Sequence, residues 1–285
     1  MRQDLIQLYD DFTHGRMSRR RFMERLAHAA GGAAAATALL SVLENDYARA
    51  ETVAETDPRI TTEAVAIPAV QGLTGYLARP KGAAGPLPAV LVIHENRGLN
   101  PHIRDVTRRV GAEGFLALGL DFLSPMGGTP DDQDKGREMI GQLKPEDAVA
   151  YGRAAIAWLK ANPEANGKAG AAGFCWGGGM VNRLAVAEPA LDAGVAYYGI
   201  QPPADQVGAI HAALLLHYAG LDERITSGAA AYEAALKAAG KTVQAYVYPG
   251  VNHAFNNDTA GPRYDKAAAD LAWGRTIAWL REYLA

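Results

Sequence analysis

From Pro58 onward, the sequence alternates short β-rich runs with longer helical patterns. This alternation is typical of α/β proteins, in which helices cover both faces of a mostly parallel sheet. No internal repeat and no second domain boundary interrupts it, so we expect residues 51–285 to form one domain. Open α/β sheets bind ligands at the carboxyl ends of their strands, which predicts where the functional residues lie.

The pattern also places the individual elements. Runs 65–67 and 73–78 predict an opening hairpin, and the continuous apolar run 89–93 is typical of a buried central strand. A loop rich in Gly, Pro and Asp, 124–135, is long enough to be a lid. Further strands are predicted at 115–120, 169–173, 193–198, 213–219 and 242–248, and helices at 103–113, 146–161, 177–187, 225–239 and 264–283.

Composition excludes several classes of function. The 285 residues are 49% hydrophobic, which is enough for a full core, and the formal net charge is only -3. The one dense basic cluster, 17–25, is too local to favour nucleic-acid binding. The single cysteine, Cys175, can form no internal disulfide and no multi-cysteine zinc site. We therefore expect no metal, no cofactor and no nucleic-acid partner.

The first fifty residues resemble an export signal. The segment 18–23, Ser-Arg-Arg-Arg-Phe-Met, is similar to the twin-arginine motif, and a weakly apolar run follows at 26–43. Ala and Gly give that run too little transfer energy for a stable membrane anchor. Ala48-Arg49-Ala50 suits a signal peptidase, so residues 1–50 are predicted to engage the twin-arginine export machinery and to be removed. The protein would then be periplasmic or secreted, and cytoplasmic if the leader is not functional.

An amphipathic helix is the alternative for this segment. Apolar residues before the arginines recur at helical spacing, and such a helix could pack on the body or on a partner. These residues are Leu5, Ile6, Leu8, Tyr9 and Phe12.

Cys175 lies in the segment that carries the clearest chemistry. Gly173-Phe174-Cys175-Trp176-Gly177 stands between an apolar strand and a helical segment and matches the nucleophile elbow G-x-S-x-G, with Cys in place of Ser. Both glycines are needed because a side chain there would collide with the adjacent strand or helix. The following helix dipole favours a thiolate, and the turn aims the Trp176 N–H at a developing oxyanion. The alternative is a buried cysteine in an ordinary glycine-rich turn.

Two partners follow in the order that α/β-hydrolases use, nucleophile, acid and then histidine. Asp222 comes after the apolar run 213–219 and is placed to orient a histidine, although it could instead cap a helix that starts near Ile225. His253 comes after the run 242–248 and is the general base by position. His94 and His217 belong to strands, and His14 and His28 belong to the leader, so none of these four fits as well.

These motifs resemble the dienelactone hydrolase family, also called carboxymethylenebutenolidases, from about Gly72 to Leu284, and the resemblance implies the α/β-hydrolase fold. The segments 92–100 and 196–199 are also similar to family segments. The resemblance implies that Glu95 holds the resting thiol and that the Asn96 N–H completes the oxyanion hole with Trp176. From its position alone, Glu95 could equally pair with Arg97 or Arg104.

A thioester mechanism follows from these residues. The Cys175 thiolate, generated by His253 with Asp222 behind it, attacks an ester carbonyl, and water then hydrolyses the thioester. Activated substrates such as enol lactones or aryl esters suit a thiolate best, because the thiolate is itself a good leaving group. The sequence therefore predicts a carboxylic ester or lactone hydrolase.

Substrate charge is expected to differ from the family pattern. The resemblance implies two arginines that hold a substrate carboxylate, but one of these positions is Asn257 here, and Arg137 matches the other only loosely. Arg263 could fold back and replace the missing charge. Neutral esters are therefore predicted to be better substrates than dienelactone itself.

Two other functions compete with this one. A general carboxylesterase or thioesterase could use the same fold and triad, since neither fixes the acyl or alcohol group. A binding protein that kept the pocket but lost the chemistry is the other possibility, although Cys175, Asp222 and His253 argue against it.

Overall fold

The computed structural model describes residues 1–47 and 51–285. Its centre is an eight-stranded sheet in the order β1-β2-β4-β3-β5-β6-β7-β8. β1 (Ile60–Ala66) and β2 (Thr74–Pro80) run antiparallel at one edge. All later strands pair in parallel, which confirms the predicted α/β-hydrolase fold. These strands are β3 (Leu87–Ile93), β4 (Leu116–Asp121), β5 (Ala165–Phe174), β6 (Ala193–Tyr197), β7 (Ala213–Ala219) and β8 (Val243–Tyr248).

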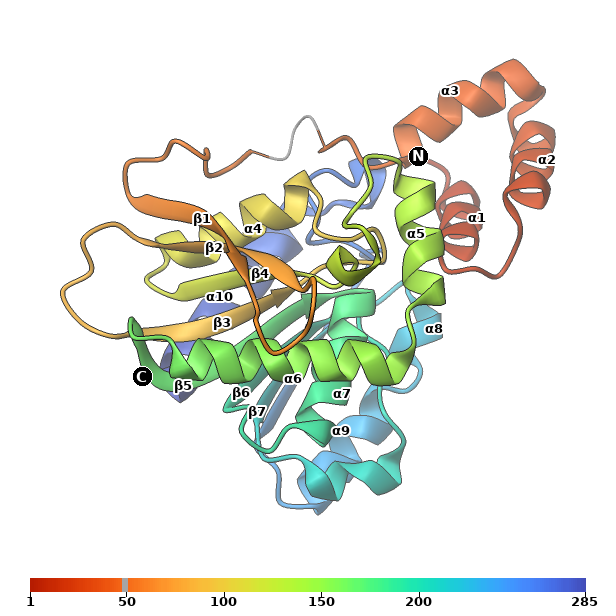
Figure 1. The fold of residues 1–285 in the computed structure, drawn as a ribbon. Helices are drawn as coiled ribbons and strands as arrows, with labels where there is room; N and C mark the ends of the chain where they lie inside the picture. The colour runs from red at the N-terminus through yellow and green to blue at the C-terminus, as the bar shows by residue number, and fades with distance from the viewer. Residues whose placement is uncertain (48–50) are drawn as a thin grey trace.

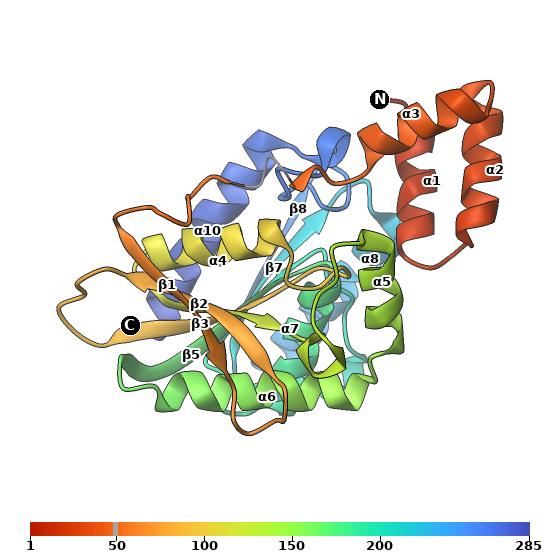
Figure 2. The ribbon, with the colours of Figure 1, turned by 45° about the horizontal axis from the view of Figure 1, so that its top comes forward.

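Helices cover both faces of this sheet, and Figure 2 shows them on its two sides. α4 (Pro101–Ala112) and α10 (Lys266–Leu284) pack on one face, and α6 (Pro145–Ala161), α7 (Trp176–Ala187) and α9 (Ala229–Ala238) pack on the other. β3 shows why both faces need cover. Its residues alternate between the two cores, with Leu91 and Ile93 on one side and Val90 and Val92 on the other. We call residues 60–284 the α/β body.

Three further helices at the N-terminus form a separate unit. They are α1 (Gln3–Thr13), α2 (Arg19–Ala30) and α3 (Ala33–Leu43), and Figure 1 shows them projecting from one end of the α/β body. We call residues 3–43 the N-terminal unit. Its helices enclose their own apolar core, in which the rings of Phe12 and Phe22 stack with centroids 4.5 Å apart. The buried members are Leu5, Ile6, Leu8, Tyr9, Phe12, Phe22, Leu26, Ala36, Leu40 and Leu43.

Polar contacts hold the N-terminal unit against the α/β body. The last carbonyls of α1 have no partner within the helix, and the body supplies donors for them. Arg137 donates to the carbonyl of Phe12 at 2.8 Å, and the side chain of Asn96 donates to that of Thr13 at 2.8 Å. Arg263 donates to the carbonyl of Leu43 at 3.3 Å. Arg137 and Asn96 thus hold the end of α1, and Arg263 holds the end of α3.

The structure therefore contains the amphipathic helix that the sequence offered as an alternative, since all five of its apolar residues are buried. Ser18, within the twin-arginine-like segment, caps α2 by accepting a hydrogen bond from the Arg21 N–H.

Among the described residues, no single helix is long and apolar enough to span a membrane, although α2 and α3 together reach that length with a bend of 109°. The expected cleavage site, Ala48-Arg49-Ala50, lies outside the described residues, and export stays a prediction.

Two helical regions of the α/β body differ from expectation. The Gly-Pro-Asp loop gives way to a helix, α5 (Gln133–Gln142), which begins at Asp132 because that side chain caps the first turn. The loop itself is anchored, since Thr129 donates to the carboxylate of Asp121 at 2.8 Å. The single helix predicted at 225–239 is two helices, α8 (Glu223–Thr226) and α9, separated at Ser227 and Gly228.

Candidate active site

The nucleophile elbow has the strained geometry that its glycines predicted. Cys175 has φ 56° and ψ -112°, between β5 and α7. A Cβ on Gly173 would lie 2.2 Å from the carbonyl oxygen of Gly177, and a Cβ on Gly177 would lie 2.4 Å from that of Ile93. The strain is held by the sheet, because the Cys175 N–H donates to the carbonyl of Tyr197 at 3.0 Å. This turn presents the thiol at the carboxyl edge of the sheet.

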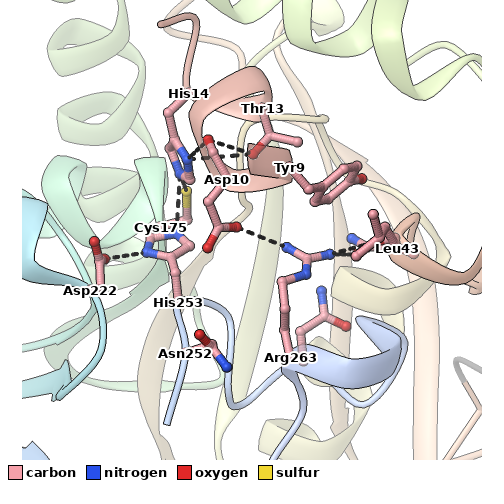
Figure 3. A network of polar contacts seen from close by, with 12 residues as sticks. Tyr9, Asp10, Thr13, His14, Leu43, Cys175, Asp222, Asn252, His253 and Arg263 are labelled. Carbon is pink, nitrogen blue, oxygen red and sulfur yellow. Dashed lines mark hydrogen bonds and ion pairs between the residues drawn. The ribbon is translucent and has the colours of Figure 1, made fainter. Parts of the chain in front are cut away.

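Asp222 and His253 meet beside Cys175, as Figure 3 shows. His253 Nδ1 lies 2.6 Å from Asp222 Oδ2, and its Nε2 lies within 4.8 Å of Cys175 Sγ. Asp222 precedes α8, but its side chain makes no capping hydrogen bond, so the structure does not support the capping role. The fold thus brings together three residues that lie far apart along the chain and that the sequence analysis had grouped by their order.

The charges of His253 and its two neighbours shift the pKa values of this site. Burial alone would lower the pKa of His253, but the neighbouring Cys175 and Asp222 raise it to about 10. Burial likewise opposes ionisation of Asp222, yet His253 holds the pKa of that carboxyl below its usual value. An imidazolium paired with the Asp222 carboxylate is therefore the favoured state at neutral pH.

A fourth residue, His14, reaches this group from the end of α1. Its Nε2 lies 3.4 Å from Cys175 Sγ and 3.2 Å from His253 Nε2. Burial and then the charge of His253 hold the pKa of His14 well below its usual value. The sequence analysis placed His14 in the predicted leader and gave it no role in the site, whereas in the full chain it lies beside Cys175.

A cavity of about 430 Å³ opens in front of Cys175. Trp176, Tyr198 and three isoleucines give it an apolar lining, and both the N-terminal unit and α5 contribute to its wall. The other lining residues are Thr13, His14, Gly15, Asn96, Arg137, Glu138, Gly141, Arg224 and His253, and the isoleucines are Ile140, Ile200 and Ile225. Apolar walls with few polar groups are typical of sites for small organic ligands.

Comparisons with known proteins identify the family of this chain. A family model described as "Dienelactone hydrolase family" matches residues 73–284. The chain belongs to the dienelactone hydrolase family. A second model, described as "YqhI-like", matches residues 1–32, which include α1 and α2.

Several relatives of this hydrolase are similar over most of their length. A protein of Escherichia coli O157:H7 named "Putative carboxymethylenebutenolidase" is 34% identical over 251 residues, which cover 82% of this chain and 92% of that protein. A protein of Methylorubrum extorquens with the same name is 33% identical, covering 77% of this chain and 80% of its own. The crystal structure of a "Putative Dienelactone Hydrolase" from Klebsiella pneumoniae has a TM-score of 0.70 and 30% identity, over 79% of this chain and 99% of that one.

Glu95 of this hydrolase does not have the partner that the family resemblance implied. Its buried carboxylate accepts a hydrogen bond from Asn257 at 2.9 Å, whereas the near neighbour of the thiol is His14. Arg104 lies over the ring of Tyr76, so it does not pair with Glu95 either. Asn257 is itself fully used, because its oxygen accepts hydrogen bonds from the N–H and hydroxyl of Thr259. Asn257 therefore orients Glu95 and does not line the cavity.

The two arginines considered for a substrate carboxylate lie in different places. Arg137 lines the cavity, but its guanidinium donates to Phe12, lies 4.1 Å from the ring centroid of that residue and pairs with Asp134. Arg263 lies away from the cavity. It is buried, donates to Asn45 at 2.6 Å and does not line the cavity, so the structure does not place it where it could replace the missing charge.

Tyr198 is a site residue that the sequence did not single out. Its ring centroid lies 4.7 Å from that of His253, and its buried hydroxyl has no hydrogen-bond partner among the described residues. Tyr198 has φ 39°, and the described non-glycine residues with positive φ are only Cys175, Tyr198 and Ala254, the last of which follows His253. The flanking glycines predicted the strain at Cys175, but the strain at Tyr198 and Ala254 has no signal in the sequence alone.

Proposed function

We propose that this hydrolase cleaves esters or lactones through a thioester on Cys175, with His253 and Asp222 completing the triad. The observation that carries the proposal is the contact of 2.6 Å between His253 and Asp222 beside a cysteine held at a strained elbow. Membership of the dienelactone hydrolase family supports the same reaction class.

In the first half-reaction, the Cys175 thiolate attacks the carbonyl carbon and forms a carbon–sulfur bond. The oxyanion forms against the N–H groups of Trp176, at the start of α7, and of Asn96. The intermediate then collapses, the bond to the leaving oxygen breaks, and His253 gives that oxygen its proton. Asp222 keeps the imidazole oriented throughout.

In the second half-reaction, water attacks the thioester while His253 accepts its proton. The thiolate leaves, and the carboxylic acid product departs. Tyr198 offers its unpartnered hydroxyl to a substrate oxygen in the cavity. The apolar walls suit a neutral acyl or alcohol group, so a general carboxylesterase remains the second candidate.

The test is a panel of aryl esters, enol lactones and thioesters on the full chain, with mass spectrometry of quenched reactions. The proposal predicts an acyl adduct on Cys175. The Cys175→Ala variant removes one sulfur atom of packing volume, so it should keep the circular dichroism spectrum and lose at least about 1000-fold in turnover. If it kept more than about a tenth of the turnover, a loss below ~1.4 kcal/mol, Cys175 would not be the nucleophile.

We also propose that residues 1–50 direct twin-arginine export and are cleaved near Ala50. The supporting observation is the Ser18–Met23 segment followed by a weakly apolar run. Cleavage there would remove His14 from the cavity wall, so the two forms should differ in substrate range. Mass spectrometry of periplasmic protein tests the proposal, and intact Met1 on cytoplasmic protein, unchanged when Arg19 and Arg20 become Lys, would contradict it.

A further inference from the structure

The geometry points to a binding site for one divalent transition-metal ion, of the Zn²⁺ or Co²⁺ class, formed by His14, Cys175 and His253. Such an ion would join the N-terminal unit to the nucleophile. The inference does not rest on the proposed hydrolysis, because it concerns three ligand atoms and can be tested without substrate.

The first observation is that the three ligand atoms converge. His14 Nε2 lies 3.2 Å from His253 Nε2 and 3.4 Å from Cys175 Sγ, and all three atoms lie within 4.8 Å of one another. Ligand atoms around a single tetrahedral zinc are separated by roughly 3.3 to 3.6 Å, as follows from Zn–N and Zn–S bond lengths. The separations of 3.2 and 3.4 Å from His14 are close to this range.

The second observation is that hydrogen bonds at Nδ1 leave Nε2 of each imidazole as the atom that would bind a metal. His14 Nδ1 lies 2.7 Å from the carbonyl of Asp10, and because a carbonyl only accepts, Nδ1 carries the proton and Nε2 keeps its lone pair. His253 Nδ1 donates in the same way to the carboxylate of Asp222. Metal-binding histidines typically donate their other ring N–H to a carbonyl or carboxylate. Both arrangements occur here, on residues from different parts of the chain (Figure 3).

These two hydrogen bonds leave the Nε2 atoms facing each other across 3.2 Å. Two lone pairs at this distance repel unless a positive charge lies between them or beside them. A proton on His253 can supply that charge, and so can a metal ion that displaces this proton on binding. Two imidazoles and one thiolate favour zinc, cobalt or copper over magnesium or calcium.

Three protein ligands leave a fourth position, and the same three residues line the cavity in front of Cys175. Water can take that position, as in zinc sites with three protein ligands. The bound ion would occupy the lone pairs of both Cys175 and His253, so it would inhibit ester hydrolysis reversibly. No metal was expected from the sequence, since His14 lies 161 positions before Cys175.

The experiment titrates the full chain, stripped of metal with EDTA and dialysed, with Co²⁺ and records its absorption spectrum. We expect one Co²⁺ per chain, with a thiolate-to-cobalt charge-transfer band and the visible bands of four-coordinate Co²⁺. Cys175→Ser should remove the charge-transfer band. His14→Ala should weaken binding at least about 10-fold. His28→Ala, an exposed histidine of the same unit, is the matched control and should bind Co²⁺ as the unchanged protein does.

Hydrogen exchange separates loss of a ligand from loss of structure. Zn²⁺ should slow amide exchange in α1 of the unchanged chain, because the ion fastens α1 to the α/β body, and should not do so in Cys175→Ser. The site is disproved if no charge-transfer band appears or if His14→Ala binds Co²⁺ with unaltered affinity. A chain that binds Co²⁺ but cleaves no ester contradicts only the proposed hydrolysis, and an active chain without the band contradicts only the metal site.

Discussion

The α/β body and the N-terminal unit bring residues to the same cavity by different physical means. In the body, Cys175, Asp222 and His253 follow three parallel strands, whose carboxyl ends meet at one edge of the sheet. The N-terminal unit has no strand in common with the sheet. It has its own core, and side chains of the body hold the end of α1 by donating hydrogen bonds to its last two carbonyls. The sheet topology thus positions the triad, whereas docking of the N-terminal unit on the body positions part of the cavity wall in front of it.

The largest expected effect tests the body. Asp222→Asn removes the charge that orients His253 and favours the wrong tautomer, so kcat should fall by on the order of 10³- to 10⁴-fold. Asp11→Asn changes a carboxylate on α1 that pairs with Arg16, and it should stay within about twofold of the unchanged enzyme. Steady-state kinetics on an aryl ester measures both. Equal losses in the two variants would mean that Asp222 acts only through general stability.

The next effect concerns the independence of the two cores. Phe22→Ala empties the centre of the N-terminal unit, and a buried Phe→Ala change costs about 3 to 5 kcal/mol. Hydrogen exchange should speed up in α1–α3 and stay unchanged in β5 and α7. Phe115→Ala, at an equally buried position of the body, should destabilise β5 instead. If Phe22→Ala loosened β5 as much as Phe115→Ala does, the two regions would be one cooperative unit.

A smaller effect is expected in the titration of His253. Its pKa is raised from 6.5 to about 10 in the folded chain, so its protonation stabilises the fold fully below pH 6.5, and this contribution is lost as the pH rises to about 10. Cys175→Ala removes one of the two neighbours that raise it, and the pKa should fall by about 1 to 3 pH units. Imidazole resonances of metal-free protein, followed by NMR, provide the measurement. An unchanged His253 pKa in Cys175→Ala would mean that the thiol lies too far from the imidazole to form a pair with it.

The smallest effect concerns substrate charge, where the two regions meet. Arg137 is engaged by Phe12 and Asp134, and Arg224 lies 3.4 Å from Asp222, so both arginines of the cavity already have anionic or carbonyl partners. A charge-assisted pair with a substrate carboxylate contributes about 1.5 to 3 kcal/mol. Without it, a neutral aryl ester should have a kcat/KM about 10-fold or more above that of a carboxylate-bearing lactone. A preference for the anionic lactone that Arg137→Gln abolishes would show that Arg137 is free to bind it.

Much of the α/β body was predictable from the sequence, because local patterns encode it. The glycines beside Cys175 predict the elbow, and the order of Cys175, Asp222 and His253 along the chain predicts the triad. Glu95 was harder, since its hydrogen bond depends on how the loop of Asn257 folds against it. α5 was missed because its residues are mostly polar and come directly after a segment whose composition is typical of a loop. Only the capping residue Asp132 marked its start.

The contribution of the N-terminal unit could not be predicted in the same way. Amphipathic spacing in α1 predicted a helix, but nothing in that spacing says that its last residues reach Cys175. That contact depends on docking contacts from residues far along the chain, including Asn96, Arg137 and Arg263. A histidine within a predicted leader carries no local sign of a role in a distant site.

The attachment of α3 has a consequence for the order in which the chain is made. Translation produces the N-terminal helices first, and they can gather their own core early. Arg263, which binds Leu43 and Asn45, belongs to one of the last segments to leave the ribosome. Until it arrives, the Leu43 carbonyl and the Asn45 side-chain oxygen lack this donor, and His253 does not yet face His14. A nascent chain therefore completes the front of its cavity only when synthesis is nearly finished.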